Sequence, residues 1–272
     1  MKTINGYIEI DGVISKITSV EDLHHVVESL GKEFTDMTKE QLCSYLNKKR
    51  ENATQIWTDD CGVEYCNGIL NGCTKKMEQY KVAEGAVAVG GNAFCCINMP
   101  NYDFGWYCHK SANGNRYIFD VIRVIFPQSL IAIGQECFSY NNISECVFSD
   151  SIQYIGSMAF LNCINLCDGP LDLPKELRYL EAEAFAGCVS ITSVVFHDKI
   201  KEIGSHAFRG CSALNTAYIS DSVEEIGSGV FDDCPNLESI CIPKGTKAKF
   251  EKLFPFDKDK LVECETVSRN LS

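Results

Sequence analysis

The sequence predicts an α+β protein that is mostly β: a solenoid of 22–25-residue coils preceded by a small region of hairpin and helices. A phrase typified by Ile203–Cys211 recurs: all copies keep the phenylalanine, all but one keep the glycine, and the copy at Ile133 keeps only the first half. Its copies repeat every 22–25 residues, and a fixed period of this size is typical of solenoids. Apolar residues alternate before each copy, as in a strand with one buried face. The copies begin at Ile133, Ile155, Leu180, Ile203 and Ile226.

Composition and charge restrict the class of protein. The 272 residues are 45% hydrophobic and 23% charged, which is typical of a globular chain. The net charge of −12 would repel a polyanion, so nucleic-acid binding is not expected. No apolar run suits a signal peptide or a membrane span, which predicts no membrane insertion. As the sequence stands, a cytoplasmic location is expected; a trimmed signal would place the protein at the cell surface or outside the cell.

Residues 1–55 are predicted to form a region of their own, without the repeat. Two β-favouring runs within residues 7–17 flank Asp11-Gly12, a dipeptide typical of a tight hairpin. Thr18 and Glu21 fit the start of a helix. Thr38 and Gln41 fit the start of a second helix, which is expected to run to about Lys49. This region could cap the solenoid or serve as a separate recognition domain.

The solenoid is expected over residues 56–262, followed by a tail at 263–272. Residues 56–80 are interpreted as a degenerate first coil. The motif returns clearly at Gly90, and Gly134 follows after 44 residues, which is two steps of 22. One eroded coil is therefore expected around residues 100–118. In total the spacing predicts seven or eight coils.

Regular coils share a pattern before the motif glycine. Apolar residues stand 13, 10 and 8 positions before it; for Gly204 these are Ile191, Val194 and Phe196. This predicts stacked strands in a parallel sheet, with the motif isoleucine and phenylalanine forming the opposite wall. The motif phenylalanines should then form a continuous spine.

The C-terminal end of the solenoid is predicted to be closed by a short helix. Leu237, Ile240 and Ile242 begin one more strand, and no further motif follows. The next apolar pattern, over residues 247–254, is that of an amphipathic helix. Its candidates for burial are Ala248, Phe250, Leu253 and Phe254.

Sixteen cysteines are unusual in a chain of this length. Four of them occupy one repeated position, three residues after the motif phenylalanine, and are therefore expected to be buried, reduced thiols. They are Cys163, Cys188, Cys211 and Cys234.

The repeat phase identifies a candidate binding surface. The position nine residues before each motif glycine should point outward from the sheet, and it carries mostly apolar residues. This column contains Ile125, Val147, Asp172, Val195, Tyr218 and, in the last coil, Cys241. A polar column two positions earlier contains Arg123, Glu145, Ser193 and Thr216. Exposed apolar patches often mark partner sites, although β-branched residues also favour strands on either face.

The motif and the strand before it resemble the BspA-like leucine-rich repeat family. Ile203-Gly204, Ala207-Phe208 and Gly210-Cys211 match the turn of that repeat, and Leu173-Pro174 and Ile240-Cys241-Ile242-Pro243 match its strand end. The resemblance covers about residues 82–262. It implies a leucine-rich-repeat fold and, because known members are largely bacterial, a bacterial origin. It also implies a role in adhesion or protein binding, with no catalytic residues.

We find no pattern of an enzyme and expect neither catalytic residues nor a cofactor. The five histidines stand outside known catalytic motifs. The function predicted from the sequence is therefore a non-catalytic module that binds a protein partner on the sheet face, with an oligomeric state that the sequence does not assign. One alternative is a surface or secreted adhesin that binds a host or matrix protein.

A second alternative is a zinc- or thiol-dependent protein that uses the cysteine-rich segment 56–110. Cysteine pairs of suitable spacing can hold structural zinc, but a complete second pair is missing, so no metal ligand is assigned. The cysteines of this segment are Cys61, Cys66, Cys73, Cys95, Cys96 and Cys108.

Overall fold

The computed structural model describes most of the solenoid and parts of the N-terminal region. The described residues are 6–10, 13–17, 38–51, 56–60, 62–66, 68–73, 79–91, 93–94 and 122–264. The chain divides into two compact units, Met1–Lys49 and Arg50–Ser272.

The first unit contains the predicted hairpin. Strands β1 (Gly6–Ile10) and β2 (Val13–Ile17) pair antiparallel, with Ile10 opposite Val13, which confirms it. The Asp11-Gly12 turn and the helix predicted after Thr18 lie outside the described residues.

Helix α2 (Lys39–Glu51) begins where the sequence predicted. The backbone N–H of Thr38 donates to Gln41 Oε1 at 2.9 Å, and the backbone N–H of Gln41 donates to Thr38 Oγ1 at 3.3 Å. These reciprocal bonds satisfy amides at the first turn, which have no partner within the helix. The capping box is therefore confirmed, and the helix ends slightly beyond the predicted Lys49.

The second unit begins with an antiparallel meander. Strands β3 (Ile56–Thr58), β4 (Val63–Cys66) and β5 (Ile69–Cys73) pair in sequence. The prediction of a degenerate coil over residues 56–80 is therefore wrong for the meander, because tight turns reverse the chain there. Strand β5 then pairs parallel with β7 (Ala88–Val89), so the meander supplies the first rung of the solenoid.

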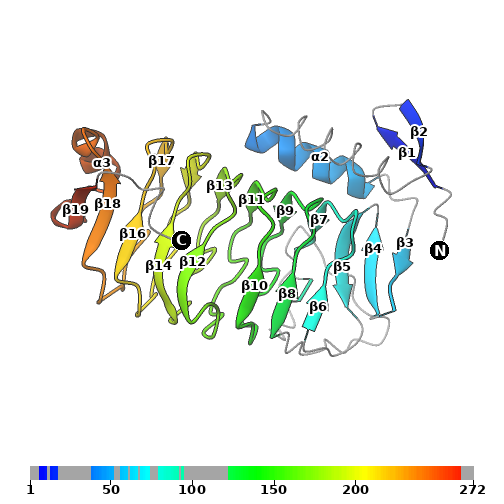
Figure 1. Cartoon of the computed structure of the whole chain (residues 1–272), viewed down its shortest axis with the longest axis horizontal. Helices are drawn as coiled ribbons and strands as arrows, with labels where there is room; N and C mark the ends of the chain where they lie inside the picture. The colour runs from blue at the N-terminus through cyan, green and yellow to red at the C-terminus, as the bar shows by residue number, and fades with distance from the viewer. Residues whose placement is uncertain are drawn as a thin grey trace. The chain divides into compact units, whose positions relative to one another are not determined.

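The coils alternate between two walls, which Figure 1 shows as rows of neighbouring strands. The first strand of each coil lies in the outer sheets, and the second lies in an inner sheet that is continuous from β3 to β17. The outer strands are β6 (Gln79–Lys81), β8 (Arg123–Ile125), β10 (Glu145–Val147), β12 (Gly169–Asp172), β14 (Ile191–Val195), β16 (Thr216–Tyr218) and β18 (Ser239–Pro243). The other inner strands are β9 (Ala132–Ile133), β11 (Tyr154–Ile155), β13 (Tyr179–Leu180), β15 (Glu202–Ile203) and β17 (Glu225–Ile226). In the described part of the chain, six two-strand coils are thus followed by a seventh, which β18 begins.

A spine of stacked phenylalanines runs through the core, as predicted. Ring centroids are 5.2 Å apart for Phe138–Phe160, 5.0 Å for Phe160–Phe185 and 5.3 Å for Phe185–Phe208. These rings are fully buried and nearly parallel within each pair. The spine therefore sets the spacing of successive coils.

The coil predicted around residues 100–118 is not part of the stack. Strand β6 pairs directly with β8, β7 pairs directly with β9, and the Phe94 ring stacks on Phe138 at 5.1 Å. A Cβ on Gly134 would lie 2.6 Å from the Gly91 nitrogen, so nothing fits between these coils. Residues 95–121, which include the coil predicted around residues 100–118, lie outside the described residues.

The repeated cysteines make a second ladder. Each thiol donates to the carbonyl oxygen of the motif phenylalanine in the preceding coil, at Sγ···O distances of 3.0–3.3 Å. The ladder consists of Cys163–Phe138, Cys188–Phe160, Cys211–Phe185 and Cys234–Phe208. Asn141 occupies the same position one coil earlier, and its Nδ2 donates to the Phe94 carbonyl at 3.0 Å. Each of the phenylalanine carbonyls of the ladder also accepts a backbone N–H from its own coil, so the cysteine is a buried filler that adds a second donor from the next coil.

The C-terminal end continues the spine and then adds a strand. Helix α3 (Lys247–Leu253) is followed by Phe254, whose ring lies 5.9 Å from Phe231. Phe250 and Phe254 are buried and Leu253 packs against the core, as predicted. Ala248 is exposed, so its predicted burial is wrong.

The strand after α3 was not predicted. A 3₁₀ helix, η2 (Lys258–Lys260), leads into β19 (Leu261–Cys264), which pairs parallel with β18. The outer sheet therefore ends at β19 and not at the last motif strand.

Candidate recognition surface

The predicted outward column exists in the outer sheets. Ile125 pairs in register with Lys81 on one side and with Val147 on the other. Beyond β10, the residues in mutual register are Asp172, Val195, Tyr218, Cys241 and Val262. The motif phase alone therefore identified neighbouring positions on strands more than 20 residues apart in sequence.

The column is divided between β10 and β12, which do not pair. Cys167 and Gly169 have positive φ values of 58° and 146°, and the register shifts between Gly169 and Pro170. Proline has no N–H to offer a ladder and is found at irregular strand positions. The outer face thus consists of a three-stranded part, β6-β8-β10, and a five-stranded part, β12-β14-β16-β18-β19.

The two parts differ in exposure. Val147 is 37% exposed and Ile125 is half-buried, as a solvent-facing column requires. Val195 and Cys241 are only 5% and 8% exposed, so the expectation that the whole column faces solvent is wrong. The register places Tyr218 between these two residues, so each has a large aromatic neighbour within one strand spacing.

A polar column borders the apolar one. Arg123 and Glu145 are in register, and Arg123 Nε lies 2.8 Å from Glu145 Oε2. On the other part, Ser193 and Thr216 occupy the corresponding positions and are half-buried. The predicted rim is therefore present, with an ion pair beside Ile125 and Val147.

A shallow hollow of about 210 Å³ lies beside Val195. It is lined by Phe196 and His197 from the end of β14 and by Lys175 and Glu176 from the turn after β12. His197 is half-buried, and its Nε2 lies 2.9 Å from Oδ1 of Asp172 in the outer column. The lining of this hollow contains no serine, threonine or cysteine beside the histidine.

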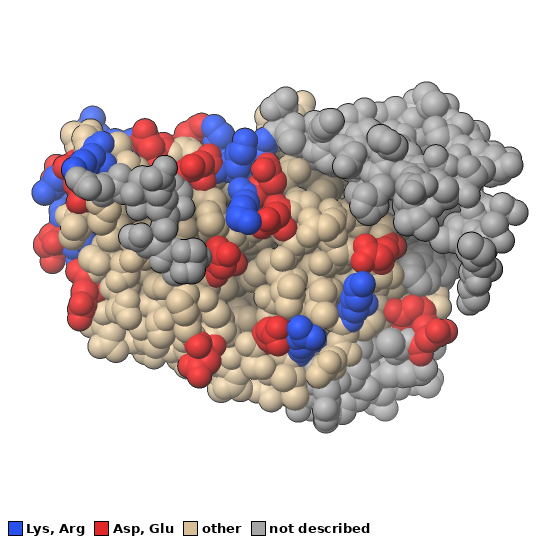
Figure 2. Space-filling view, in the orientation of Figure 1, with Lys and Arg blue, Asp and Glu red and all other residues tan. Residues whose placement is uncertain are grey.

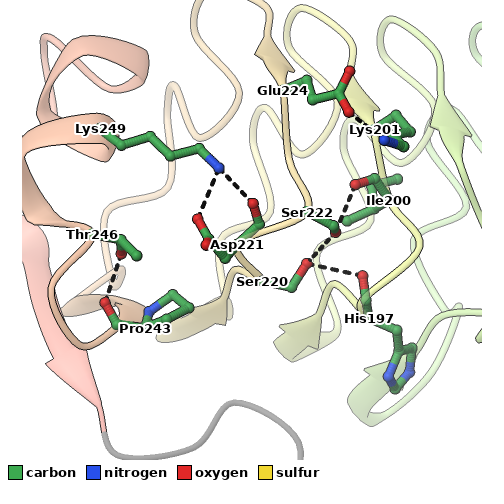
Figure 3. A network of polar contacts seen from close by, with 10 residues as sticks. All are labelled: His197, Ile200, Lys201, Ser220, Asp221, Ser222, Glu224, Pro243, Thr246 and Lys249. Carbon is green, nitrogen blue, oxygen red and sulfur yellow. Dashed lines mark hydrogen bonds and ion pairs between the residues drawn. The ribbon is translucent and has the colours of Figure 1, made fainter.

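The turns after the outer strands are held by hydroxyl groups (Figure 3). Ser220 Oγ donates to the His197 carbonyl at 3.0 Å, and Ser222 Oγ donates to the Ile200 carbonyl at 2.8 Å. Ser151 makes the equivalent bond to Leu130 at 2.9 Å. These bonds join one coil to the preceding coil and leave the turns ordered beside the sheet.

A buried polar group that the sequence did not indicate joins the meander to the first coil. The Tyr65 and Tyr80 hydroxyls contact each other, and Tyr80 donates to Asp59 Oδ2 at 2.6 Å. The Ala83 N–H donates to the Tyr65 hydroxyl at 3.0 Å. Burial, followed by these hydrogen bonds, raises the pKa of Tyr80 well above its usual range. The network is thus a structural link and not an acid or base for neutral pH.

The ladder cysteines have the environment of structural, protonated thiols. Burial raises the pKa of Cys188 well above its usual range and that of Cys234 to about 11. Thiolates are the reactive and metal-binding form, and here the protonated thiols serve as donors. Within the described ranges, no three His, Cys, Asp or Glu side chains converge as metal ligands.

Four of the six cysteines of segment 56–110 lie outside the described residues. These are Cys61, Cys95, Cys96 and Cys108, whereas Cys66 and Cys73 are in β4 and β5. Zinc binding by this segment therefore stays a prediction.

Two members of the outward column were missed by the sequence reasoning. Lys81 stands nine residues before Gly90, so the motif phase could have identified it. Val262 is 46% exposed and has no motif after it, so only the pairing of β19 with β18 reveals it.

Comparison with known protein families identifies the same repeat. The family model of the BspA type leucine rich repeat region matches residues 64–167 and 131–255 in six copies. No match to the chain was found among curated proteins. In the part of the chain that the structure describes, no helix combines the length and apolar character needed to cross a bilayer.

Three solved structures are similar. A T. pallidum leucine-rich repeat protein is 22% identical over 73% of this chain and 92% of that chain, with a TM-score of 0.48. A leucine-rich cell surface protein from Faecalibacterium prausnitzii A2-165 is 20% identical over 73% of this chain and 40% of that chain, with a TM-score of 0.41. The pneumococcal vaccine antigen PcpA is 16% identical over 76% of this chain and 46% of that chain, with a TM-score of 0.52.

At such identities the similarity concerns the fold, and the TM-score for PcpA supports it. The family match extends over well more than half of the sequence, and its repeats coincide with the stacked coils. The chain belongs to the BspA-type leucine-rich repeat family.

Proposed function

We propose that the protein is a non-catalytic recognition module, and that a protein partner binds the outer face around Ile125 and Val147. The observation that carries this proposal is the register of β8 and β10, which sets these two apolar side chains next to each other on the solvent side. Val147 is 37% exposed, and the Arg123–Glu145 ion pair lies in the adjacent column.

Such a surface has the features of a small binding centre. Apolar side chains that become buried on association supply most of the favourable free energy, and a polar border excludes water and fixes orientation. Lys81 continues the column on the neighbouring strand and adds a cation at its end. A partner with an apolar anchor flanked by an acidic group would complement this arrangement.

The scaffold favours recognition because it is already ordered. The stacked phenylalanines support the outer strands from the core. Serine hydroxyls hold the turns that follow these strands through hydrogen bonds to the preceding coil. Association then requires little ordering of the face, which reduces the entropic cost of binding.

The five-stranded part has a secondary role in this proposal. Asp172 is exposed and Tyr218 is half-buried, so both remain available as contacts. Val195 and Cys241, predicted as contact residues from the sequence, are buried and would support their neighbours in the column.

The test is a double variant, Ile125→Ser with Val147→Glu. We expect it to fold as the wild type does, because Val147 is exposed and Ile125 is half-buried. The partner retained by immobilised wild-type protein from a lysate of the native organism should be lost by the variant. Binding-rate measurements with that isolated partner should show at least a tenfold loss of affinity, because burying one apolar anchor contributes roughly 1.5–3 kcal/mol.

A matched control carries the same changes elsewhere. Ile164→Ser with Val189→Glu alters side chains that are 52% and 38% exposed in the turns that follow the repeat cysteine. The control should retain the partner. Equal binding by both variants, with native circular dichroism, would exclude the β8–β10 face as the binding site.

A further inference from the structure

Charge is distributed unevenly along the solenoid. Residues 122–243 contain six Lys and Arg residues against sixteen Asp and Glu residues. Residues 244–264, which form the C-terminal end, contain six lysines against four acidic residues. This end is therefore positive on a protein whose net charge is −12. Figure 2 shows basic side chains interspersed with acidic ones at the end formed by α3 and β18.

Most lysines and arginines of the body of the solenoid, residues 122–243, form ion pairs. Several lysines of the C-terminal end, residues 244–264, do not. Four of the six body cations pair with an acidic residue of a neighbouring coil. These pairs are Arg123–Glu145, Lys175–Asp150, Lys201–Glu224 and Arg209–Asp233. Lys247, Lys252 and Lys258 are exposed and make no ion pair with any described residue.

The acidic residues at this end are partly occupied. Asp257 Oδ1 lies 3.3 Å from Lys260 Nζ. Glu263 Oε1 accepts from the backbone N–H groups of Gly245 at 3.0 Å and Lys247 at 3.3 Å. Lys249 Nζ forms an ion pair with Asp221 Oδ1 at 2.9 Å. The other two acidic residues of this end are Glu251 and Asp259. They are fewer than the three lysines without an ion pair.

An aromatic side chain protrudes on the short segment between α3 and η2. Phe256 is 87% exposed, although Phe254, two residues earlier, is buried against the spine. Pro255 separates the two, so the chain turns one ring into the core and the next into solvent. Lys258 follows two residues after Phe256, so one short segment carries both an exposed ring and an exposed cation.

We propose that this end, defined by Lys247, Lys252, Phe256 and Lys258, binds the surface of an anionic phospholipid bilayer. Lysines attract an anionic surface as point charges, and an exposed phenylalanine inserts at the interface between headgroups and acyl chains. All six cations of this end are lysine, whereas a site built for defined carboxylate or phosphate geometry favours arginine.

The acidic body does not cancel this attraction. Charges farther away than about 8 Å are largely screened at physiological salt. The contact would therefore be made by the end of the solenoid, with the acidic sides held away from the membrane and the outer face left accessible.

The experiment measures co-sedimentation of the full chain with vesicles. Wild-type protein should bind vesicles of phosphatidylcholine mixed with phosphatidylglycerol and should not bind vesicles of phosphatidylcholine alone. Each lysine near an anionic surface strengthens binding roughly fivefold, so Lys247→Glu/Lys252→Glu/Lys258→Glu should weaken it by more than tenfold. Phe256→Ser should weaken it roughly tenfold, because insertion of the ring is lost. High salt should reduce binding by the wild type.

The matched control reverses three lysines on the body, as Lys175→Glu/Lys199→Glu/Lys201→Glu, and thus gives the same change in net charge. It should bind vesicles nearly as well as the wild type, and thermal unfolding should show that both triple variants fold. Failure of the wild type to bind anionic vesicles would overturn the proposal. So would equal binding to neutral vesicles, or an equal loss in both triple variants. Binding of polyglutamate in place of vesicles would show that the surface recognises acidic peptides, and the membrane proposal would then be wrong.

Discussion

The inner and outer walls of the solenoid are built from the same coils but differ in continuity. The inner sheet runs unbroken from β3 to β17, beside the phenylalanine spine and the cysteine ladder. The outer wall is interrupted between β10 and β12 and differs in exposure on the two sides. The contrast indicates that the inner wall determines how coils stack, whereas the outer wall is free to vary in shape and chemistry.

The largest expected effect is on the inner wall. Phe208→Ala removes a fully buried ring stacked on Phe185 and should lower the free energy of unfolding by about 3–5 kcal/mol. Val147→Ala on the outer wall should cost less than about 1 kcal/mol, because Val147 is 37% exposed. Urea denaturation of both variants measures the difference. Similar losses in the two variants would contradict the assignment of stacking to the inner wall.

A smaller effect is expected from one rung of the cysteine ladder. Cys188→Ala removes the thiol that donates to the Phe160 carbonyl at 3.2 Å, so that carbonyl keeps only the Cys163 backbone N–H as donor, at 3.1 Å. The free energy of unfolding should fall by about 1–2 kcal/mol, from the lost hydrogen bond and the space left by the sulfur atom. Cys188→Ser keeps a donor and should recover part of this loss in the same denaturation assay. If serine is no better than alanine, the cysteine acts through volume alone.

The smallest effect concerns the pH dependence of the ladder. Burial raises the pKa of Cys188 well above its ordinary value of 9.0, and raises that of Cys234 to about 11. A raised folded pKa means that the stabilisation is fully present below pH 9 and is lost as the pH rises, because the unfolded chain releases the proton first. Stability should therefore decline from pH 9 toward pH 11. Between pH 8 and pH 10, Cys188→Ala should lose about 1 kcal/mol less than the wild type. Parallel pH profiles would show that Cys188 does not contribute to this decline.

Features fixed by the repeat phase could be predicted from the sequence, and features fixed by tertiary neighbours could not. The phase gave the register of Ile125 with Val147 and of Val195 with Tyr218, because parallel coils align equivalent positions. It could not show that Val195 is buried, since that depends on surrounding side chains.

The spacing between successive motif glycines does not by itself determine the number of coils. Two periods between Gly90 and Gly134 fit an extra coil and fit equally an insertion of the same length. Strand β19 was missed because its pairing with β18 is not accompanied by the motif. The binding face cannot be derived from phase, because the sequence does not state which exposed column meets a partner.

The direct stacking of Phe94 on Phe138 affects how this chain can evolve. The two coils meet in the same way whatever length of chain connects them, since their rings and strands contact each other directly. Doubling the length of a connecting loop costs only about 0.6 kcal/mol in closure entropy. Sequence can therefore be gained, lost or exchanged at this joint at little thermodynamic cost, and new binding properties can arise there without rebuilding the solenoid.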